Sequence, residues 1–166
     1  MVMHRSERWL LPVAVGFVLV LASIAAQGQQ LIVQNEGGKQ VILSRADLEA
    51  LPHVTLKATA HGVSSSFEGV QVESVLEKAG VGFGEALRGK RLASCLVAEA
   101  ADGYRVVIAL PEIDPAFTDK QIVLAFLKDG KPLDENEGPY RIVIPDEKRP
   151  ARWIRQLTML KIVNVQ

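Results

Sequence analysis

Hydrophobic residues recur at helical spacing in one segment of the chain. Val72, Val75, Leu76 and Ala79 occupy positions i, i+3, i+4 and i+7, which places them on one face of a helix. The glycine that follows is the usual residue where a helix ends in a left-handed conformation. The pattern predicts an amphipathic helix over residues 71–79.

Most other hydrophobic residues fall in short runs with the length and alternation of β-strands. Turn residues separate these runs, and Asp129-Gly130 favours a tight hairpin. We expect strands at residues 31–33, 40–43, 54–60, 91–98, 105–110, 122–127, 141–144 and 154–165.

A second, shorter helix is predicted over residues 45–51. Ser44 and Asp47 have the spacing of a capping box, and Pro52 ends the segment. Helices are few, strands are many, and no helix regularly follows each strand. This arrangement indicates an α+β fold of mixed or antiparallel β-sheets rather than a doubly wound parallel sheet.

Two polar or glycine-rich segments are predicted to be loops. Residues 61–66 contain a glycine and three consecutive serines. Gly80, Gly82 and Gly84 form a Gly-x-Gly-x-Gly pattern, but a phosphate-binding loop of this kind follows a strand and opens a helix. Because these glycines follow a helix, we expect a loop without a ligand.

The first 28 residues have the pattern of a secretory signal peptide. Basic residues precede an uncharged, mostly aliphatic run over residues 10–26, and small residues follow it. An uncleaved anchor is the alternative, because the run is at the short limit of a membrane-spanning helix. We expect an exported, periplasmic protein whose residues 29–166 form one domain, with no stable membrane span after cleavage.

Composition narrows the possible partners and metal sites. The 166 residues carry 19 basic and 19 acidic side chains, which argues against a protein built to bind nucleic acid. The single cysteine, Cys95, excludes an intrachain disulfide and a cysteine-rich zinc site. It lies in an apolar run, so we expect a buried, unreactive thiol.

A basic stretch near the C-terminus is a candidate anion site. Residues 148–155 hold four cations beside Trp153, and such cations bind phosphate groups through charge-assisted hydrogen bonds. If Trp153 begins a strand, Arg152 and Arg155 point to opposite faces and cannot form one clamp. A solvated basic loop around a half-buried tryptophan is the alternative.

Several short segments stand out in order along the chain. They are Phe67-Glu68-Gly69-Val70, Ala101-Asp102-Gly103-Tyr104, Leu124-Ala125-Phe126, Asp129-Gly130-Lys131-Pro132-Leu133, Gly138-Pro139-Tyr140-Arg141 and Arg152-Trp153-Ile154. In this order they resemble the sulfite oxidase-type molybdopterin-binding domain of the molybdopterin-dependent oxidoreductases, and they cover nearly the whole chain after the signal peptide.

The resemblance implies a pterin cofactor seated against a fold of mixed sheets. It also implies a cysteine ligand to molybdenum just before the Phe67 segment, near Ala58, where this chain has no cysteine. A thiolate is a soft anionic ligand that Ala58 and Thr59 cannot replace, whereas His61 offers a neutral nitrogen. Cys95 does not match the ligand position.

Two hypotheses about function follow from the resemblance. The first is a degenerate, non-redox binding or accessory domain with no metal ligand of its own, which takes a pterin or small anion and a periplasmic protein partner. The second is an active oxidoreductase with an atypical metal site. The candidate cofactor-binding residues are His61, Arg141, Arg152 and Trp153.

Overall fold

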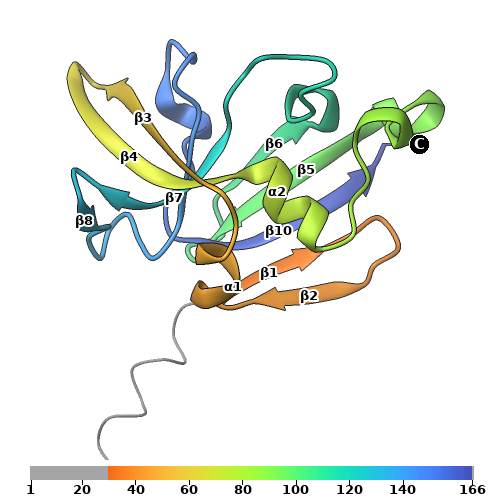
Figure 1. Cartoon of the computed structure of the whole chain (residues 1–166), viewed down its shortest axis with the longest axis horizontal. Helices are drawn as coiled ribbons and strands as arrows, with labels where there is room; N and C mark the ends of the chain where they lie inside the picture. The colour runs from red at the N-terminus through yellow and green to blue at the C-terminus, as the bar shows by residue number, and fades with distance from the viewer. Residues whose placement is uncertain (1–29, 166) are drawn as a thin grey trace, which may run out of the picture.

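The computed structural model describes residues 30–165, so the predicted signal peptide at residues 1–28 lies outside the described residues. The described part contains two β-sheets, two short α-helices and several turns of 3-10 helix (Figure 1). Its elements are β1 (Leu31–Gln34), β2 (Gln40–Leu43), α1 (Arg45–Glu49), β3 (His53–Ala60), β4 (Val63–Gln71), α2 (Val72–Lys78), η1 (Gly84–Ala86), η2 (Gly89–Ala93), β5 (Ser94–Ala100), β6 (Arg105–Ala109), η3 (Leu110–Glu112), β7 (Val123–Lys128), β8 (Lys131–Pro132), β9 (Arg141–Val143), η4 (Pro150–Arg152) and β10 (Leu157–Asn164).

The first sheet joins the two ends of the described chain. Its strand order is β2-β1-β10-β5-β6, with β1 parallel to β10 and the other pairs antiparallel. Alternate residues of β5, among them Leu96 and Ala98, are buried, while those between them are only partly covered. This period-two burial is that of a sheet with one face on the core.

The second sheet is antiparallel and has the order β3-β4-β7-β8, with β9 paired to β7. Together the two sheets confirm the α+β class with mixed sheets and few helices. α2 follows β4 directly and buries Val72, Val75 and Leu76, the face that the sequence pattern predicts. The capping box of Ser44 and Asp47 at α1 is also present. No helix within residues 30–165 is long and hydrophobic enough to cross a bilayer.

Gly69 lies where β4 comes closest to β7. A Cβ atom built on it would lie 2.0 Å from the backbone oxygen of Leu124 and 2.7 Å from the Cα of Ala125. The pairing of the two strands also shifts register between Glu68 and Gly69, as at a β-bulge. Close backbone contact therefore accounts for the glycine of the Phe67-Glu68-Gly69-Val70 segment.

The predicted loop over residues 61–66 is wrong. β4 begins at Val63, so only His61 and Gly62 form the connection, and both have positive φ values, of 52° and 81°. Such a pair makes a two-residue turn that matches the twist of the flanking strands. Ser64 and Ser65 pair with Thr59 and Ala58, because serines are tolerated in a ribbon with one solvent-facing side.

Two other boundaries differ from the sequence prediction. The predicted strand at residues 91–98 begins only at Ser94, because residues 89–93 form η2. Arg91 donates to the carbonyls of Gly82 and Ala86 and pairs with Glu36, which fixes it in a turn. Trp153 does not begin a strand, since it follows the 3-10 turn η4 and β10 starts at Leu157.

Candidate functional site

A cleft lies between the β3–β4 hairpin and residues 147–155, a segment that we call the arch. Two adjoining cavities, of about 420 and 640 Å³, form the cleft and share His61 and Pro150. The lining comes from both sides and from β7 and β9. It consists of Thr59, Ala60, His61, Gly62, Val63, Ser65, Phe67, Lys128, Glu137, Arg141, Lys148, Arg149, Pro150, Ala151, Trp153 and Arg155.

A partly buried charge cluster forms the floor of the cleft. Arg141, which is 6% exposed, pairs with Glu137 at 2.8 Å, and Lys128 pairs with the same carboxylate oxygen at 3.0 Å. The Nε atom of Arg141 and the second oxygen of Glu137 are buried without a hydrogen-bond partner in residues 30–165. Buried polar atoms of this kind ordinarily have a partner, so the floor retains hydrogen-bonding capacity for a ligand.

Aromatic rings form one wall of the cleft. Phe67 and Trp153 meet edge to face with their centroids 6.2 Å apart, and the Arg141 guanidinium carbon lies 5.2 Å from the Phe67 centroid. The Trp153 indole donates to the carbonyl of Ile144 at 2.8 Å. This hydrogen bond satisfies the only polar atom of the ring and holds the ring in a fixed orientation.

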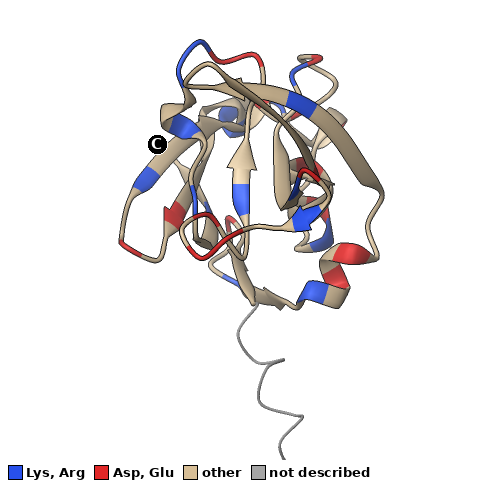
Figure 2. Ribbon diagram, turned by 90° about the vertical axis from the view of Figure 1, so that its left-hand side faces the viewer, with Lys and Arg blue, Asp and Glu red and all other residues tan. Residues whose placement is uncertain are grey.

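Three cations at the inner side of the arch have no acidic partner. Lys148, Arg149 and Arg155 line the cleft, and none of them makes an ion pair with any residue that the structure describes. With Lys128 and Arg141 they place five cations against the single carboxylate of Glu137. Elsewhere blue and red segments are interspersed over the ribbon (Figure 2). The cleft is therefore electropositive in a chain of zero formal charge.

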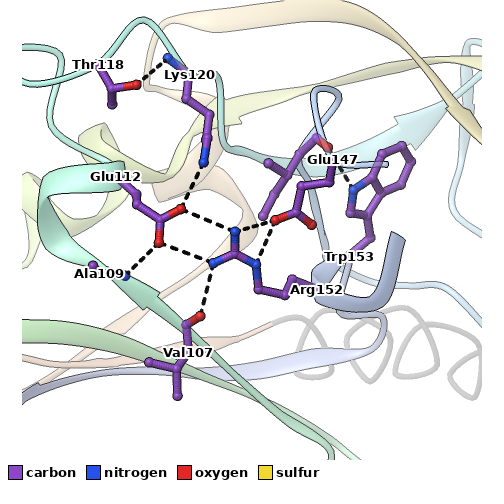
Figure 3. Close-up of polar contacts among 9 residues, drawn as sticks. Val107, Ala109, Glu112, Thr118, Lys120, Glu147, Arg152 and Trp153 are labelled. Carbon is purple, nitrogen blue, oxygen red and sulfur yellow. Dashed lines mark hydrogen bonds and ion pairs between the residues drawn. The ribbon is translucent and has the colours of Figure 1, made fainter. Parts of the chain in front are cut away.

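The outer side of the arch carries a second charge cluster, which we call the clasp: Arg152, Glu147, Glu112 and Lys120 (Figure 3). Arg152 donates to both oxygens of Glu112, at 3.3 and 3.2 Å, and through Nε to Glu147 at 2.6 Å. Lys120 binds Glu112 at 2.8 Å. The clasp thus attaches the arch to η3.

The clasp changes the ionisation of its central carboxylate. Burial by itself opposes ionisation of Glu112, but hydrogen bonds from Arg152 and Lys120 outweigh burial and lower its pKa to about 2. The same bond to Glu112 raises the pKa of Arg152. Both groups are consequently charged at neutral pH.

The structure brings together three of the four predicted cofactor-binding residues. His61, Arg141 and Trp153 all line the smaller cavity, whereas Arg152 faces the clasp and does not line the cleft. Arg155 takes a position in the cleft that the sequence analysis did not assign to it. The expectation that Arg152 and Arg155 point apart rested on a strand beginning at Trp153, which does not form, so the sequence held no local signal for this position.

The Asp102-Gly103-Tyr104 segment lies against the middle of the arch. Tyr104 donates its hydroxyl hydrogen to the carbonyl of Ala151 at 2.9 Å. Tyr104 and Asp102 also line a separate cavity of about 290 Å³, to which Trp153 and Arg155 contribute. Trp153 and Arg155 therefore form a wall between the cleft and this neighbouring cavity.

The glycine-rich loop is used internally. The backbone N–H of Gly84 donates to the Asp114 carboxylate at 2.7 Å, and Asp114 is almost fully buried. The other oxygen of Asp114 accepts from the N–H of Ala116. A protein carboxylate therefore occupies the donor that a bound anion would need.

Cys95 lies in a different sheet from the β3–β4 hairpin of the cleft. It is on β5 of the first sheet, while β3 and β4 belong to the second. It is half-buried rather than buried as predicted, because the alternation of β5 turns it outward, and burial raises the pKa of its thiol. No cysteine lines the cleft, and no group of three His, Cys, Asp or Glu residues within residues 30–165 is placed to hold a metal ion.

Comparison with known proteins gives one family and one fold. The family model described as the oxidoreductase molybdopterin binding domain matches residues 19–165. The sulfane dehydrogenase SoxCD from Paracoccus pantotrophus has a similar solved structure, with a TM-score of 0.65 and 20% sequence identity. The match covers 84% of this chain but 39% of the SoxCD chain. The comparison with curated proteins finds no match.

Proposed function

Because the chain belongs to the oxidoreductase molybdopterin binding domain family, we propose that it is an exported binding or accessory domain that holds a pterin-type anion in the cleft. In this proposal the chain supplies no thiolate to molybdenum and performs no redox step of its own. The observation that carries the proposal is the convergence of five cations and two aromatic rings on the two adjoining cavities of the cleft.

The residues of the cleft fit an anionic heterocycle. Phe67 and Trp153 offer apolar walls for a flat ring, and Lys148, Arg149 and Arg155 are free of carboxylate partners in the described chain. Arginine and lysine bind phosphate oxygens through charge-assisted hydrogen bonds, and arginine also does so in bidentate fashion. The unpaired Nε of Arg141 adds a donor at the floor.

The residues do not fit a molybdenum ion bound by a protein thiolate. Ala58 is buried and Thr59 lines the larger cavity, so the end of β3 presents a methyl group and a hydroxyl where the family resemblance implies a cysteine. Cys95 lies in the other sheet. We therefore derive no chemical step through the metal.

Export and a protein partner complete the proposal. The basic start, the apolar run and the small residues before residue 29 support secretion into the periplasm. A periplasmic protein partner is also part of the proposal.

The alternative is an active oxidoreductase with an atypical metal site. His61 favours it, because this imidazole lines both cavities at the end of β3. Neutral imidazole is a good ligand for several transition metals, but it is neither anionic nor soft. If His61 holds the metal, His61→Ala abolishes bound metal, while His53→Ala does not, because His53 binds Glu68 and the carbonyl of Glu49 instead of lining the cleft.

One pair of measurements tests the proposed function. The full chain is exported from a host that makes the cofactor, and molybdenum is measured by elemental mass spectrometry and pterin by fluorescence after acid oxidation. We expect pterin with little or no metal. Near-stoichiometric molybdenum contradicts the non-redox proposal and favours the alternative, and the absence of pterin contradicts the assignment of the ligand.

A further inference from the structure

The clasp joins three segments on the side of the arch that faces away from the cleft. Glu147 and Arg152 both belong to the arch, so their pairing closes the arch on itself. Glu112 belongs to η3, and the Val107 carbonyl on β6 also accepts from Arg152. The arch is thereby fixed both internally and to the neighbouring sheet (Figure 3).

The residues that follow Arg152 face the cleft. Trp153 is adjacent in sequence and forms the aromatic wall, and Arg155 lies two residues further on. The backbone between them does not belong to a strand, and Gln156 has a positive φ of 49°. Backbone hydrogen bonds from the N–H of Ile142 to the carbonyl of Ile154, and from the N–H of Gln156 to the carbonyl of Glu137, hold the chain after Trp153. The clasp adds side-chain contacts before Trp153, at Arg152.

We propose that Arg152 is a positioning residue for the cleft: through Glu112 and Glu147 it fixes the arch so that Trp153 and Arg155 face the ligand. The inference rests on the proposed function of the cleft as an anion site. Arg152 itself does not touch the ligand.

Positioning and simple electrostatics predict opposite results for one substitution. Glu112→Gln removes a negative charge near an anion site, so electrostatic attraction alone predicts tighter anion binding. It also removes the carboxylate that holds Arg152, so a positioning role predicts weaker binding. The sign of the change separates the two explanations.

The test uses inorganic pyrophosphate as the probe and the exported protein, made from a chain that carries Trp9→Phe. This background leaves Trp153 as the only tryptophan. Pyrophosphate affinity is measured by isothermal titration calorimetry, and exposure of Trp153 by acrylamide quenching of its fluorescence. We expect Glu112→Gln and Arg152→Gln each to weaken binding on the order of tenfold, as loss of an orienting partner does at other sites, and to increase quenching.

Three further variants serve as controls. Arg155→Gln should weaken pyrophosphate binding without increasing the quenching of Trp153, because it removes a ligand contact and leaves the clasp intact. Arg105→Gln removes the exposed Arg105–Glu99 pair on the other sheet and should change neither quantity. Arg152→Lys should restore the charge but not the fork that reaches two carboxylates, so affinity should stay below that of wild type.

The outcomes separate the two proposals. Tighter or unchanged binding in Glu112→Gln overturns the positioning role. No pyrophosphate binding by the parent chain contradicts the anion site instead, and quenching in Glu112→Gln then still shows whether the clasp fixes the arch. If Arg152→Gln fails to fold, Glu147→Gln, which leaves Arg152 bound to Glu112, is expected to give the same changes to a smaller degree.

Discussion

The arch carries arginine on both sides, and the two sides differ in whether the arginine is paired with carboxylates. On the outer side, Arg152 is bound to Glu112 and Glu147. On the inner side, Arg149 and Arg155 have no acidic partner among residues 30–165. The difference teaches that a run of cations in a sequence has no single role, because the carboxylates brought to it by the fold decide which cations remain available to a ligand.

The largest effect is expected from a substitution in the sheet below both sides of the arch, which leaves the clasp residues unchanged. Gly69→Ala places a Cβ against the β7 backbone, which cannot move as a side chain can. We expect a loss of about 3 kcal/mol or more in the free energy of unfolding, measured by urea denaturation. Gly37→Ala is the control, since its nearest atom is 3.5 Å away. Equal stability in the two variants would contradict the close packing.

The next largest effect is expected at the floor of the cleft. Arg141→Met leaves the largely buried Glu137 with Lys128 as its remaining cation, and breaking a buried ion pair costs about 3 kcal/mol. Adding Glu137→Gln should recover much of this loss, because position 137 then no longer carries a charge that has lost one of its two cations. A double-mutant cycle in urea measures the coupling, and additive losses would show that the pair is independent.

The clasp gives a smaller, pH-dependent effect. Glu112 has its pKa lowered from 4.5 to about 2, so its contribution to stability is present above pH 4.5 and is lost as the pH falls toward 2. Because the group is partly exposed, we expect Glu112→Gln to cost about 1 kcal/mol at pH 7. The stability difference from wild type should vanish near pH 2 in urea titrations. A difference independent of pH would assign the effect to packing.

The smallest effect is expected at the inner side. Lys148→Gln removes one exposed, unpaired cation from the cleft, so pyrophosphate affinity should fall about two- to threefold at low salt and less at high salt. Stability should change by less than about 0.5 kcal/mol. Calorimetry at two ionic strengths measures the first quantity and urea denaturation the second. Lys39→Gln, outside the cleft, is the matched control and should leave affinity unchanged.

Local patterns in the sequence were enough for much of the fold. The spacing of Val72, Val75 and Leu76 predicts α2, and Ser44 with Asp47 predicts the start of α1, because each depends on residues a turn apart. Asp129-Gly130 predicts the β7–β8 hairpin for the same reason, and both residues have positive φ. The family resemblance added the type of fold.

Features that depend on distant partners could not be predicted in this way. The 3-10 turn at residues 89–93 is held by Arg91, whose partner Glu36 is 55 residues away. Arg152 meets Glu112 across 40 residues, so the sequence could not exclude it from the cleft. His61 lies in the β3–β4 turn and Arg141 on β9, 80 residues further along the chain, and only the fold brings them to one cavity.

The parallel pairing of β1 with β10 has a consequence for the order of folding. Ile32 pairs with Met159, so the first and last strands of the described chain are neighbours near the middle of their sheet. Contacts so far apart in sequence close large loops and slow folding. During synthesis the β1–β2 hairpin therefore cannot pair with its neighbouring strand until β10 has been made. In chains that end before β10, β1 and β5 lack the strand that lies between them, and we expect such chains to aggregate.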